Sequence, residues 1–330
     1  MAMMKGTERP KLFVTRKIPQ IGLDLLSKAC DVEVYPEDTP IPRSEFLKRI
    51  ADKDGVLCLL TEAINGETFD AAPKAKGFAN FAVGFDNMDV AEATKRKVPL
   101  SNTPDVLTEA TADMAWALLF AVARRIVESD GVMRSGAWKG WGPLQFIGGD
   151  IQGTTLGILG AGRIGAAMAR KSTGFKMKIL YHDARPNPDL EKELGARFVD
   201  LDTLVSSSDY LSVHVPLMPQ TRHLITYQTF QKMKRTAYLI NTARGPIVKE
   251  DDLVRALKEG LIAGAGLDVY EKEPLMAEGL ASCANVVICP HTASATVSSR
   301  NGMAVKAATN LLAMVKGEKA PDCLNPGVYG

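Results

Sequence analysis

The stretch Gly157-Ile-Leu-Gly-Ala-Gly-Arg-Ile-Gly165 decides the fold. Apolar residues precede it and the segment Ala166–Arg170 follows it, so the pattern predicts a strand, a glycine turn and a helix. Gly160 would permit the tight turn, Gly162 would let the backbone approach a pyrophosphate, and Gly165 would let the helix lie close to its strand. The stretch therefore predicts a binding site for a dinucleotide.

An acidic residue follows this stretch at the distance such a site requires. Lys178–His182 is typical of a second strand and ends at Asp183, 21 positions after Gly162. A carboxylate there would bind the hydroxyls of an adenosine ribose, while the helix N-terminus at Arg163 and Ile164 would hold the pyrophosphate. A glycine turn and a surface aspartate in a protein that binds no nucleotide remain the alternative, but the spacing favours the nucleotide.

The composition is that of an ordinary globular protein. Its 330 residues are 46% hydrophobic and 24% charged, which allows two domains with ample cores. The formal net charge is +2, and the short basic cluster Lys95-Arg96-Lys97 is typical of a solvated helix end. The sequence therefore predicts no nucleic-acid partner.

Neither a membrane segment nor a disulfide framework is expected. The start of the chain lacks the apolar core of a signal peptide, and the longest apolar run, Met114–Ala123, is shorter than the roughly 18 residues that a membrane span needs. The five cysteines are scattered and show no C-x-x-C spacing, which predicts reduced thiols rather than a metal site. We expect a cytoplasmic protein that binds neither a membrane nor a metal.

Strand and helix patterns alternate along the chain, which predicts parallel sheets covered on both faces. The expected strands are 11–15, 32–35, 55–60, a strand ending at 81–86, the segment before Gly160, 178–182, 210–216, 237–241, 263–269 and 286–289. The expected helices are 18–30, 44–51 with Ser44 as its cap, the segment after Gly165, one ending at 191–195, then 201–207, 226–233, 249–259 and 296–315.

Between the two alternating halves lies a long Ala-rich segment. We expect one helix from Thr108 through Arg125 to about Ser135, of a composition that suits tight packing between two domains or two subunits. Residues 136–149 form a loop with Trp138 and Trp141. Two such aromatic side chains either pack on the protein itself or belong to an arm that reaches a neighbouring subunit.

Three polar residues stand at or just past strand ends in the second half of the chain, namely Arg244, Glu273 and His291. The carboxyl ends of parallel strands form the edge where a nicotinamide would lie, so the three can converge on one crevice. Arginine offers a planar fork for a carboxylate, histidine can titrate near neutral pH, and a glutamate can orient the imidazole and favour its charged form. Together they predict a proton-transfer site.

Each member of this set also has a plain structural interpretation. Arg244 could be a surface charge, Glu273 could begin a turn before Pro274, and His291 could hydrogen-bond a backbone carbonyl. The other three histidines stand in less suitable places, which favours His291 as the acid. His182 would lie at the adenosine end, His214 in a core strand and His223 in a polar turn.

The chain resembles the D-isomer-specific 2-hydroxyacid dehydrogenases along nearly its whole length, and within them the glyoxylate and hydroxypyruvate reductases. Several separate motifs in the family's order carry the resemblance. They are Ala-Val-Gly-Phe-Asp-Asn-Met-Asp (82–89), Asn-Thr-Pro-Asp-Val-Leu-Thr (102–108), the glycine stretch (157–165), Asn-Thr-Ala-Arg-Gly (241–245), Gly-Leu-Asp-Val-Tyr-Glu-Lys-Glu-Pro (266–274) and Pro-His-Thr-Ala-Ser (290–294).

The resemblance implies two doubly wound α/β domains. A Rossmann coenzyme domain (104–291) would be inserted into a flavodoxin-like substrate domain (1–103 and 292–330), with the active-site cleft between them. It also implies that the loop tryptophan Trp141 reaches the active site of a partner subunit, which would make the chain an obligate homodimer.

The resemblance also implies a role for each site residue. Arg244 would bind and polarise a 2-oxo acid, and His291 paired with Glu273 would be the acid. For the substrate, the resemblance implies contacts with the amides of Val83 and Gly84, with Leu59 nearby. For the coenzyme, it implies Asp268 at the nicotinamide carboxamide, Pro216 on the adenine side, and Thr242.

The expected reaction is hydride transfer from NADH to a small 2-oxo acid, with His291 as proton donor, giving a D-2-hydroxy acid or glycolate. Asp183 would repel the extra phosphate of NADP, whereas family members that use NADP tend to have Ser or Gly followed by Arg. Ala184 follows here, although Arg185 is within reach of a phosphate. We therefore predict NAD rather than NADP.

Three other activities resemble this pattern. Phosphite-oxidising relatives carry Lys where this chain has Val83 and depart from the Glu273-Pro274 motif. Phosphoglycerate dehydrogenases often add a regulatory tail, and no residues follow Gly330 here. NAD-sensing transcriptional corepressors share the fold without turnover, and steady oxidation of NADH by a 2-oxo acid would distinguish an enzyme from such a sensor.

Overall fold

The structure is a computed structural model that describes residues 9–330. It divides into two compact units. Unit 1 takes the chain up to Leu107 together with Thr296–Gly330, and unit 2 is Thr108–Ala295. Each unit is an α/β structure with its own parallel sheet. Within the described residues, no helix combines the length and the apolar character needed to cross a membrane.

Unit 1 contains a five-stranded sheet with the order β2-β1-β3-β4-β5, which is the order of the flavodoxin-like folds. Its strands are β1 (Lys11–Val14), β2 (Asp31–Val34), β3 (Gly55–Cys58), β4 (Phe78–Asn80) and β5 (Leu100–Ser101). Its helices are α1 (Gln20–Ser27), α2 (Arg43–Ile50), α3 (Gly66–Ala71), α4 (Val90–Lys95) and α12 (Val297–Lys316), followed by a short 3-10 turn, η4 (Pro326–Tyr329).

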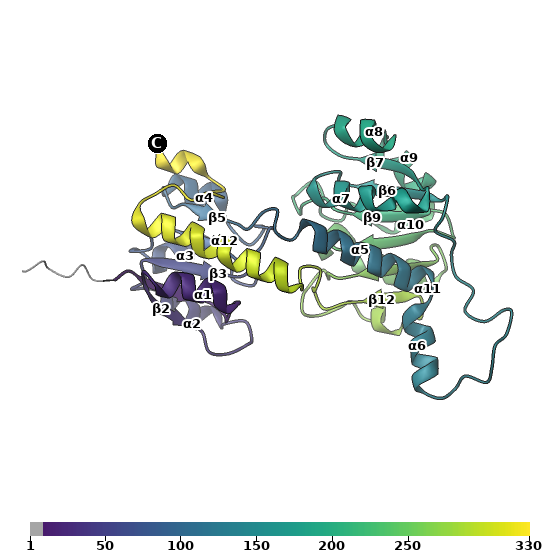
Figure 1. Cartoon of the computed structure of the whole chain (residues 1–330), viewed down its shortest axis with the longest axis horizontal. Coiled ribbons are helices and arrows are strands. Elements are labelled where there is room, and N and C mark those ends of the chain that lie inside the picture. The colour runs from purple at the N-terminus through teal and green to yellow at the C-terminus, as the bar shows by residue number, and fades with distance from the viewer. Residues whose placement is uncertain (1–8) are drawn as a thin grey trace, which may run out of the picture. The chain divides into compact units, whose positions relative to one another are not determined.

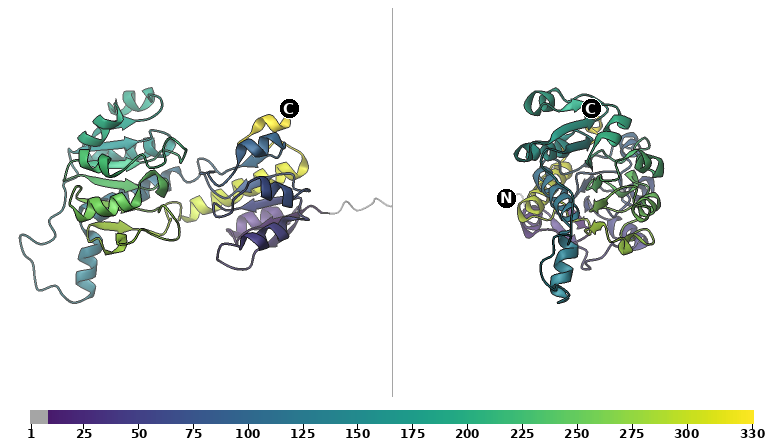
Figure 2. Two further views of the ribbon diagram at one scale, coloured as in Figure 1. Left: turned by 180° about the vertical axis from the view of Figure 1, so that it is seen from behind. Right: turned by 90° about the vertical axis from the view of Figure 1, so that its right-hand side faces the viewer.

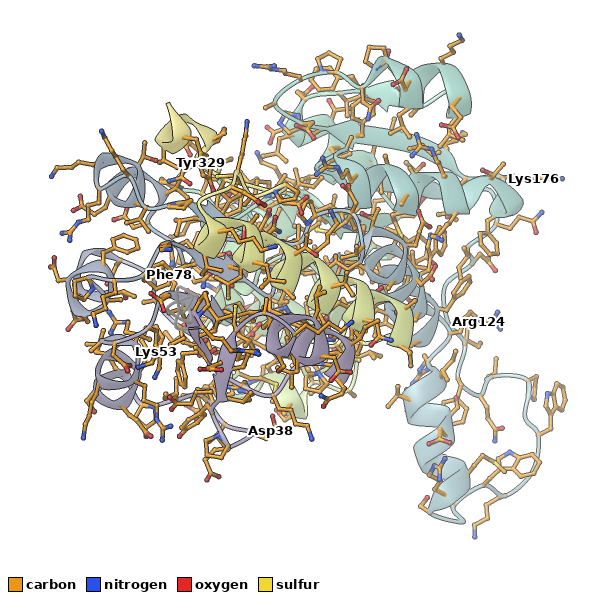
Figure 3. All side chains as sticks on the ribbon, turned by 60° about the vertical axis from the view of Figure 1, so that its left-hand side comes forward. Asp38, Lys53, Phe78, Arg124, Lys176 and Tyr329 are labelled. Carbon is orange, nitrogen blue, oxygen red and sulfur yellow. The ribbon has the colours of Figure 1, made fainter. Side chains whose placement is uncertain are left out.

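The last long helix completes unit 1. Helix α12 packs beside α1 and over β3, β4 and β5 (Figure 1). Gly55 and Gly77 make this approach possible, because a Cβ atom at Gly55 would lie 2.9 Å from Leu311 and one at Gly77 would lie 2.3 Å from the sulfur of Met314. Phe78, labelled in Figure 3, belongs to the core of this unit. A segment distant in sequence thus covers the first sheet.

Two local expectations for unit 1 were wrong in detail. Helix α2 begins at Arg43 after Pro42, so Ser44 lies inside the helix and is not its cap. The strand before the Gly84 turn ends at Asn80, and residues 81–86 already belong to the loop. Proline sets the helix start because its fixed φ angle and missing N–H suit a helix terminus.

Unit 2 contains a seven-stranded parallel sheet with the order β12-β11-β10-β9-β6-β7-β8, which has the Rossmann arrangement about its first strand. The strands are β6 (Thr155–Leu159), β7 (Lys178–His182), β8 (Arg197–Phe198), β9 (Tyr210–Val213), β10 (Tyr238–Asn241), β11 (Gly264–Leu267) and β12 (Val286–Ile288). The α-helices are α5 (Thr108–Ala123), α6 (Ile126–Arg134), α7 (Arg163–Lys171), α8 (Pro188–Leu194), α9 (Leu201–Ser207), α10 (Tyr227–Lys232) and α11 (Glu250–Lys258). Short 3-10 turns are η1 (Ser172–Phe175), η2 (Gly245–Ile247) and η3 (Leu280–Ser282).

The expectation of one helix from Thr108 to about Ser135 was wrong, because the structure has two. Helix α5 ends at Ala123, and Arg125 adopts a left-handed conformation with φ 52° before α6 begins. The guanidinium of Arg125 donates two hydrogen bonds to Glu128, at 2.7 and 2.8 Å, which holds the bend in place. Helix α6 therefore leaves the direction of α5.

Residues 125–148 form a projection that we call the arm. It extends away from the sheet of unit 2 (Figure 2), and Figure 3 shows Arg124 at its base. The chain returns where the amide of Gly149 donates to the carbonyl of Ala123 at 2.9 Å. A Cβ atom at Gly148 would lie 2.0 Å from that same carbonyl oxygen, so the return requires glycine.

Candidate active site and coenzyme site

The three glycines in the turn after β6 differ in the space around them. Gly160 has φ 98°, and a Cβ atom there would lie 2.6 Å from the amide nitrogen of Val215. A Cβ atom at Gly165 would lie 2.0 Å from the carbonyl oxygen of Gly160, so helix α7 packs directly on the turn. Around Gly162 no atom lies within 4 Å of such a Cβ. The turn is thus closed on the protein side and open at Gly162.

Asp183 lies against this turn. One carboxylate oxygen accepts the amide of Ala161 at 2.7 Å, and the other accepts the amide of Ala184 at 2.6 Å. Helix α7 begins after Gly162 with no side-chain cap, and an uncapped helix N-terminus favours an anion. The open glycine, the uncapped helix and the neighbouring carboxylate fit a dinucleotide.

The glycine turn lies where the strand order of unit 2 reverses. Strand β6 is flanked by β7 on one side and β9 on the other, and ligands of such sheets bind beyond the carboxyl ends of these strands. Pro216 follows β9 and is exposed. His214 lies one residue beyond β9 rather than within it, with Nε2 2.8 Å from the hydroxyl of Ser212 and with a buried Nδ1.

Three adjacent strands deliver the expected catalytic residues. Arg244 follows β10, Glu273 follows β11 and His291 follows β12, and these strands are parallel neighbours, so all three residues stand past the same edge. The Nδ1 atom of His291 lies 2.8 Å from a carboxylate oxygen of Glu273. The other carboxylate oxygen of Glu273 accepts the amide of Tyr270 at 3.1 Å. The structure thus pairs the imidazole with a carboxylate that is itself held in place.

The electrostatics of the pair follow from its surroundings. Burial by itself would raise the pKa of the Glu273 carboxyl group, but the hydrogen bond and the charge of His291, the amide of Tyr270 and the charge of Arg244 together lower that pKa. Glu273 is therefore ionised at neutral pH. An ionised carboxylate on Nδ1 fixes the ring so that Nε2 is the nitrogen left for proton transfer.

Asp268 has a structural task that the sequence did not suggest. Its side chain is fully buried, and its two carboxylate oxygens accept the amides of Thr292 and Ala293, each at 2.7 Å. Burial raises the pKa of this carboxyl group, and the two amides oppose the rise. His291 itself has φ 54°, a left-handed conformation that is rare for a residue with a side chain. Asp268 therefore holds the strained turn that carries the imidazole.

The Arg244 turn is shaped by Asn241. The side chain of this buried asparagine donates to the carbonyl of Arg244 and accepts the amide of Ala243, both at 3.0 Å. The guanidinium of Arg244 donates to the carbonyl of Ala243 at 2.9 Å. Within residues 9–330, the buried hydroxyl of Thr242 has no hydrogen-bond partner.

In unit 1, the three expected substrate-binding residues lie in two turns at the same edge of the sheet. Leu59 follows β3, and Val83 and Gly84 lie in the loop after β4. Asn87 donates to the carbonyl of Leu59 at 3.1 Å, and Asn80 donates both to Asn87 and to the carbonyl of Gly84. Among the described residues, none accepts the amides of Val83 and Gly84.

Trp141 lies in the arm of unit 2, and 83% of it is exposed. The asparagines that join the two turns of unit 1 were missed by the sequence interpretation, although Asn87 stands inside the quoted motif 82–89. His223 was expected only as part of a polar turn, but its Nε2 atom lies 2.7 Å from a carboxylate oxygen of Glu271. An acidic residue 48 positions away gives no local signal of this pair.

Comparison with known proteins agrees with this architecture. Residues 116–293 match the family model described as D-isomer specific 2-hydroxyacid dehydrogenase, NAD binding domain. A glyoxylate reductase of Thermococcus kodakarensis is 50% identical over 324 residues, which is 97% of either chain. A glyoxylate reductase of Pyrococcus horikoshii is 47% identical over 321 residues, 96% of each.

Solved structures are similar over nearly the full length of the chain. A crystal structure of a protein from Thermus thermophilus has a TM-score of 0.90 at 41% identity and covers 95% of this chain and 99% of that chain. The NADPH-dependent glyoxylate/hydroxypyruvate reductase of Sinorhizobium meliloti, solved with NADP and malonate, has a TM-score of 0.86 at 34% identity and covers 97% and 98%. By its dinucleotide turn, its histidine–glutamate pair and these similarities, the chain belongs to the D-isomer-specific 2-hydroxyacid dehydrogenase family.

Proposed function

We propose that the protein is a glyoxylate reductase that converts a small 2-oxo acid, glyoxylate or hydroxypyruvate, into the corresponding 2-hydroxy acid. The observation that carries this proposal is the hydrogen bond between His291 and Glu273, at 2.8 Å, on the strand edge of a dinucleotide-binding unit. Curated relatives at about half identity are named glyoxylate reductases, which supports the choice of substrate.

Three residues of unit 2 carry out the chemistry. His291 donates a proton from Nε2 to the carbonyl oxygen, while Glu273 on Nδ1 keeps the ring oriented. Arg244 binds the 2-oxo acid through its planar guanidinium and stabilises the charge that grows on the oxygen. A nicotinamide coenzyme held at the glycine turn would supply the hydride for the carbonyl carbon. Removing one such stabilising donor typically lowers kcat by about 10²- to 10³-fold.

The amides of Val83 and Gly84 are proposed to hold the substrate carboxylate. Two neighbouring N–H groups without an acceptor among residues 9–330 suit an anion, and the side chains of Asn80 and Asn102 fix the carbonyls of Gly84 and Val83, respectively. Leu59 is joined to the same loop through Asn87 and is proposed to lie beside the substrate.

We propose NAD as the preferred coenzyme, held by Gly160, Gly162, Gly165 and Asp183, with Arg163, Ile164, Pro216, Thr242 and Asp268 as further contacts. Both Asp183 oxygens already accept backbone amides, which fixes the carboxylate where an added ribose phosphate would be repelled. The Sinorhizobium enzyme is NADPH-dependent, so membership of the family does not by itself fix the coenzyme. The preference between NADH and NADPH is therefore tested directly, by comparing kcat/KM with each coenzyme.

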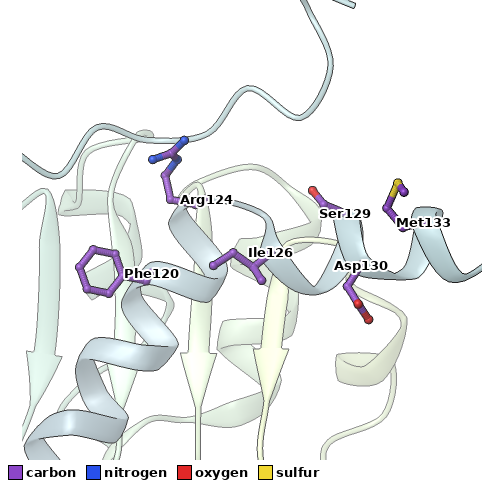
Figure 4. A pocket seen from close by; sticks show the side chains of 6 residues that line it. All are labelled: Phe120, Arg124, Ile126, Ser129, Asp130 and Met133. Carbon is purple, nitrogen blue, oxygen red and sulfur yellow. The ribbon is translucent and has the colours of Figure 1, made fainter. Parts of the chain in front are cut away.

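We also propose a homodimer that associates through the arm. The arm exposes seven large apolar side chains: Ile126, Val127, Met133, Trp138, Trp141, Leu144 and Ile147. An open hollow of about 620 Å³ lies at its base. It is lined by Phe120 of α5, by Arg124 just after that helix, and by Ile126, Ser129, Asp130 and Met133 of α6, whose side chains are labelled in Figure 4. An exposed apolar projection with a hollow at its base suits a second copy of the same chain. Trp141 would then reach the active site of the partner.

The five free thiols, of which Cys30 and Cys58 are buried, suit a reducing compartment, and we propose the cytoplasm. One experiment tests the central proposal: kcat/KM for glyoxylate, hydroxypyruvate, pyruvate, a bulkier 2-oxo acid and phosphite, each with both forms of the coenzyme. We expect glyoxylate or hydroxypyruvate with NADH to give the highest value. Binding of NADH without turnover of any substrate would overturn the proposal in favour of a sensor.

A further inference from the structure

The two turns that carry Arg244 and Glu273 touch each other backbone to backbone. After Arg244 the chain enters η2 at Gly245, and a Cβ atom at Gly245 would lie 1.9 Å from the carbonyl carbon and oxygen of Tyr270. The same atom would lie 2.4 Å from the amide of Glu271. The relative position of the two turns is therefore set at a contact where no side chain fits.

Behind this contact, a pair of reciprocal hydrogen bonds joins the turn that carries Glu273 to the start of helix α11. The amide of Glu271 donates to the carboxylate of Glu250 at 2.6 Å, and the amide of Glu250 donates to the carboxylate of Glu271 at 3.1 Å. The second oxygen of Glu250 accepts the amide of Ala277 at 2.7 Å. Glu250 is buried and is the first residue of α11, where the helix dipole favours a carboxylate.

His223 joins both turns at once. Its side chain donates from Nε2 to a carboxylate oxygen of Glu271 at 2.7 Å, and its backbone amide donates to the carbonyl of Pro246 at 2.8 Å. Pro246 belongs to the Arg244 turn, and Glu271 lies two residues before Glu273. Burial would raise the pKa of Glu271, but the Glu250 amide and His223 lower it, so the carboxylate stays charged.

We propose that His223, Glu250 and Glu271 form a clasp, a set of positioning residues that keeps Arg244 in register with the Glu273–His291 pair. The clasp acts through the two turns and contacts neither reacting group. This role rests on the proposed function, in which the guanidinium of Arg244 and the imidazole of His291 act on one substrate. A displacement of either group by about 1 Å can lower the rate about 10²-fold. The dinucleotide turn of residues 157–165 uses other contacts.

The test compares His223→Ala with His223→Gln and Glu271→Gln in the full-length protein. Glutamine at position 223 can still donate to Glu271, whereas alanine cannot. Glutamine at position 271 offers a single acceptor where two donors converge. The control is Glu259→Gln. Glu259 lies at the C-terminal end of α11, the helix that begins with Glu250, and its exposed side chain bonds Tyr227 and Arg255 rather than the clasp residues.

We expect His223→Ala to lower kcat for the best 2-oxo acid by about 10-fold or more, with the dissociation constant of NADH within about twofold of wild type. His223→Gln should restore most of kcat, Glu271→Gln should behave like His223→Ala, and the control should match wild type. Wild-type kcat in His223→Ala, or an equal loss of kcat and NADH affinity, would overturn the clasp. Absence of turnover in the wild-type protein would instead contradict the proposed function, so the two failures are distinct.

Discussion

The backbone amide of His291 donates to the carbonyl oxygen of Asp268 at 2.9 Å, so the proposed proton donor is attached to a fully buried aspartate. The same aspartate accepts the next two amides of the turn through its side chain. The left-handed conformation of His291 is therefore maintained by the end of the neighbouring strand.

Replacement of His291 by alanine tests the proton donor directly. We expect kcat for glyoxylate reduction at neutral pH to fall by about 10²- to 10⁴-fold, because general-acid catalysis contributes that much. The dissociation constant of NADH, followed by fluorescence, should change little because the glycine turn is separate. A variant that keeps nearly full kcat would show that another group supplies the proton.

Replacement of Asp268 by asparagine tests the buried anchor. An asparagine has one acceptor oxygen, so its NH₂ group would face a backbone donor, and we expect the free energy of unfolding to fall by about 1–3 kcal/mol. Activity should fall with it because the His291 turn loses a constraint. Denaturant unfolding measures the first effect, with Asp202→Asn as the exposed control. Equal stability of the two variants would contradict the anchoring role.

Replacement of Asp183 by serine tests the coenzyme preference. Without the carboxylate, the repulsion of the ribose phosphate disappears, and Arg185 can contact it. We expect the ratio of kcat/KM for NADPH to that for NADH to rise by about 10-fold or more. A wild-type enzyme that already prefers NADPH tenfold would refute the assignment of NAD.

His214 predicts a dependence of stability on pH. Burial lowers the pKa of this imidazole from 6.5 to about 4, so below pH 6.5 the unfolded chain binds a proton that the folded protein does not. Between pH 7 and pH 5 this residue should therefore cost up to about 2 kcal/mol of unfolding free energy. Urea unfolding at both pH values checks it, and His214→Gln should show a smaller decrease than wild type. If the unfolding free energy of His214→Gln fell as much between pH 7 and pH 5 as that of wild type, other groups would account for the effect.

The arm predicts the oligomeric state. We expect sedimentation to give about twice the chain mass of 35.6 kDa, and replacement of Ile126 and Val127 by glutamate to give monomers, because buried charges are costly at an apolar interface. If Trp141 reaches a partner, the monomer should also have a lower kcat/KM. Ile21→Glu, an exposed apolar position in α1, is the matched control. A monomeric wild-type protein would exclude the proposed dimer.

Local chemistry explains why much of this architecture could be predicted. The expected core helices and strands of the second half recur in the structure because apolar spacing and turn residues act over a few positions, as in α9 (Leu201–Ser207). The break at Arg125 was missed, since Ala-rich helix formers continue on both sides and the bend depends on the Arg125–Glu128 pair and the returning Gly149.

The sequence by itself determined the glycine turn at residues 157–165, since only glycine tolerates the φ of 98° at Gly160 and the close helix contact at Gly165. It also placed Arg244, Glu273 and His291 after strands. The pairing of Glu273 with His291 was expected, and the structure gives it a hydrogen bond of 2.8 Å. Only the tertiary structure decided the other contacts: the Asp268 anchor and the His223–Glu271 bond join residues 24 and 48 positions apart. Such contacts depend on the order of the parallel strands, which brings distant turns to one edge and which no local pattern encodes.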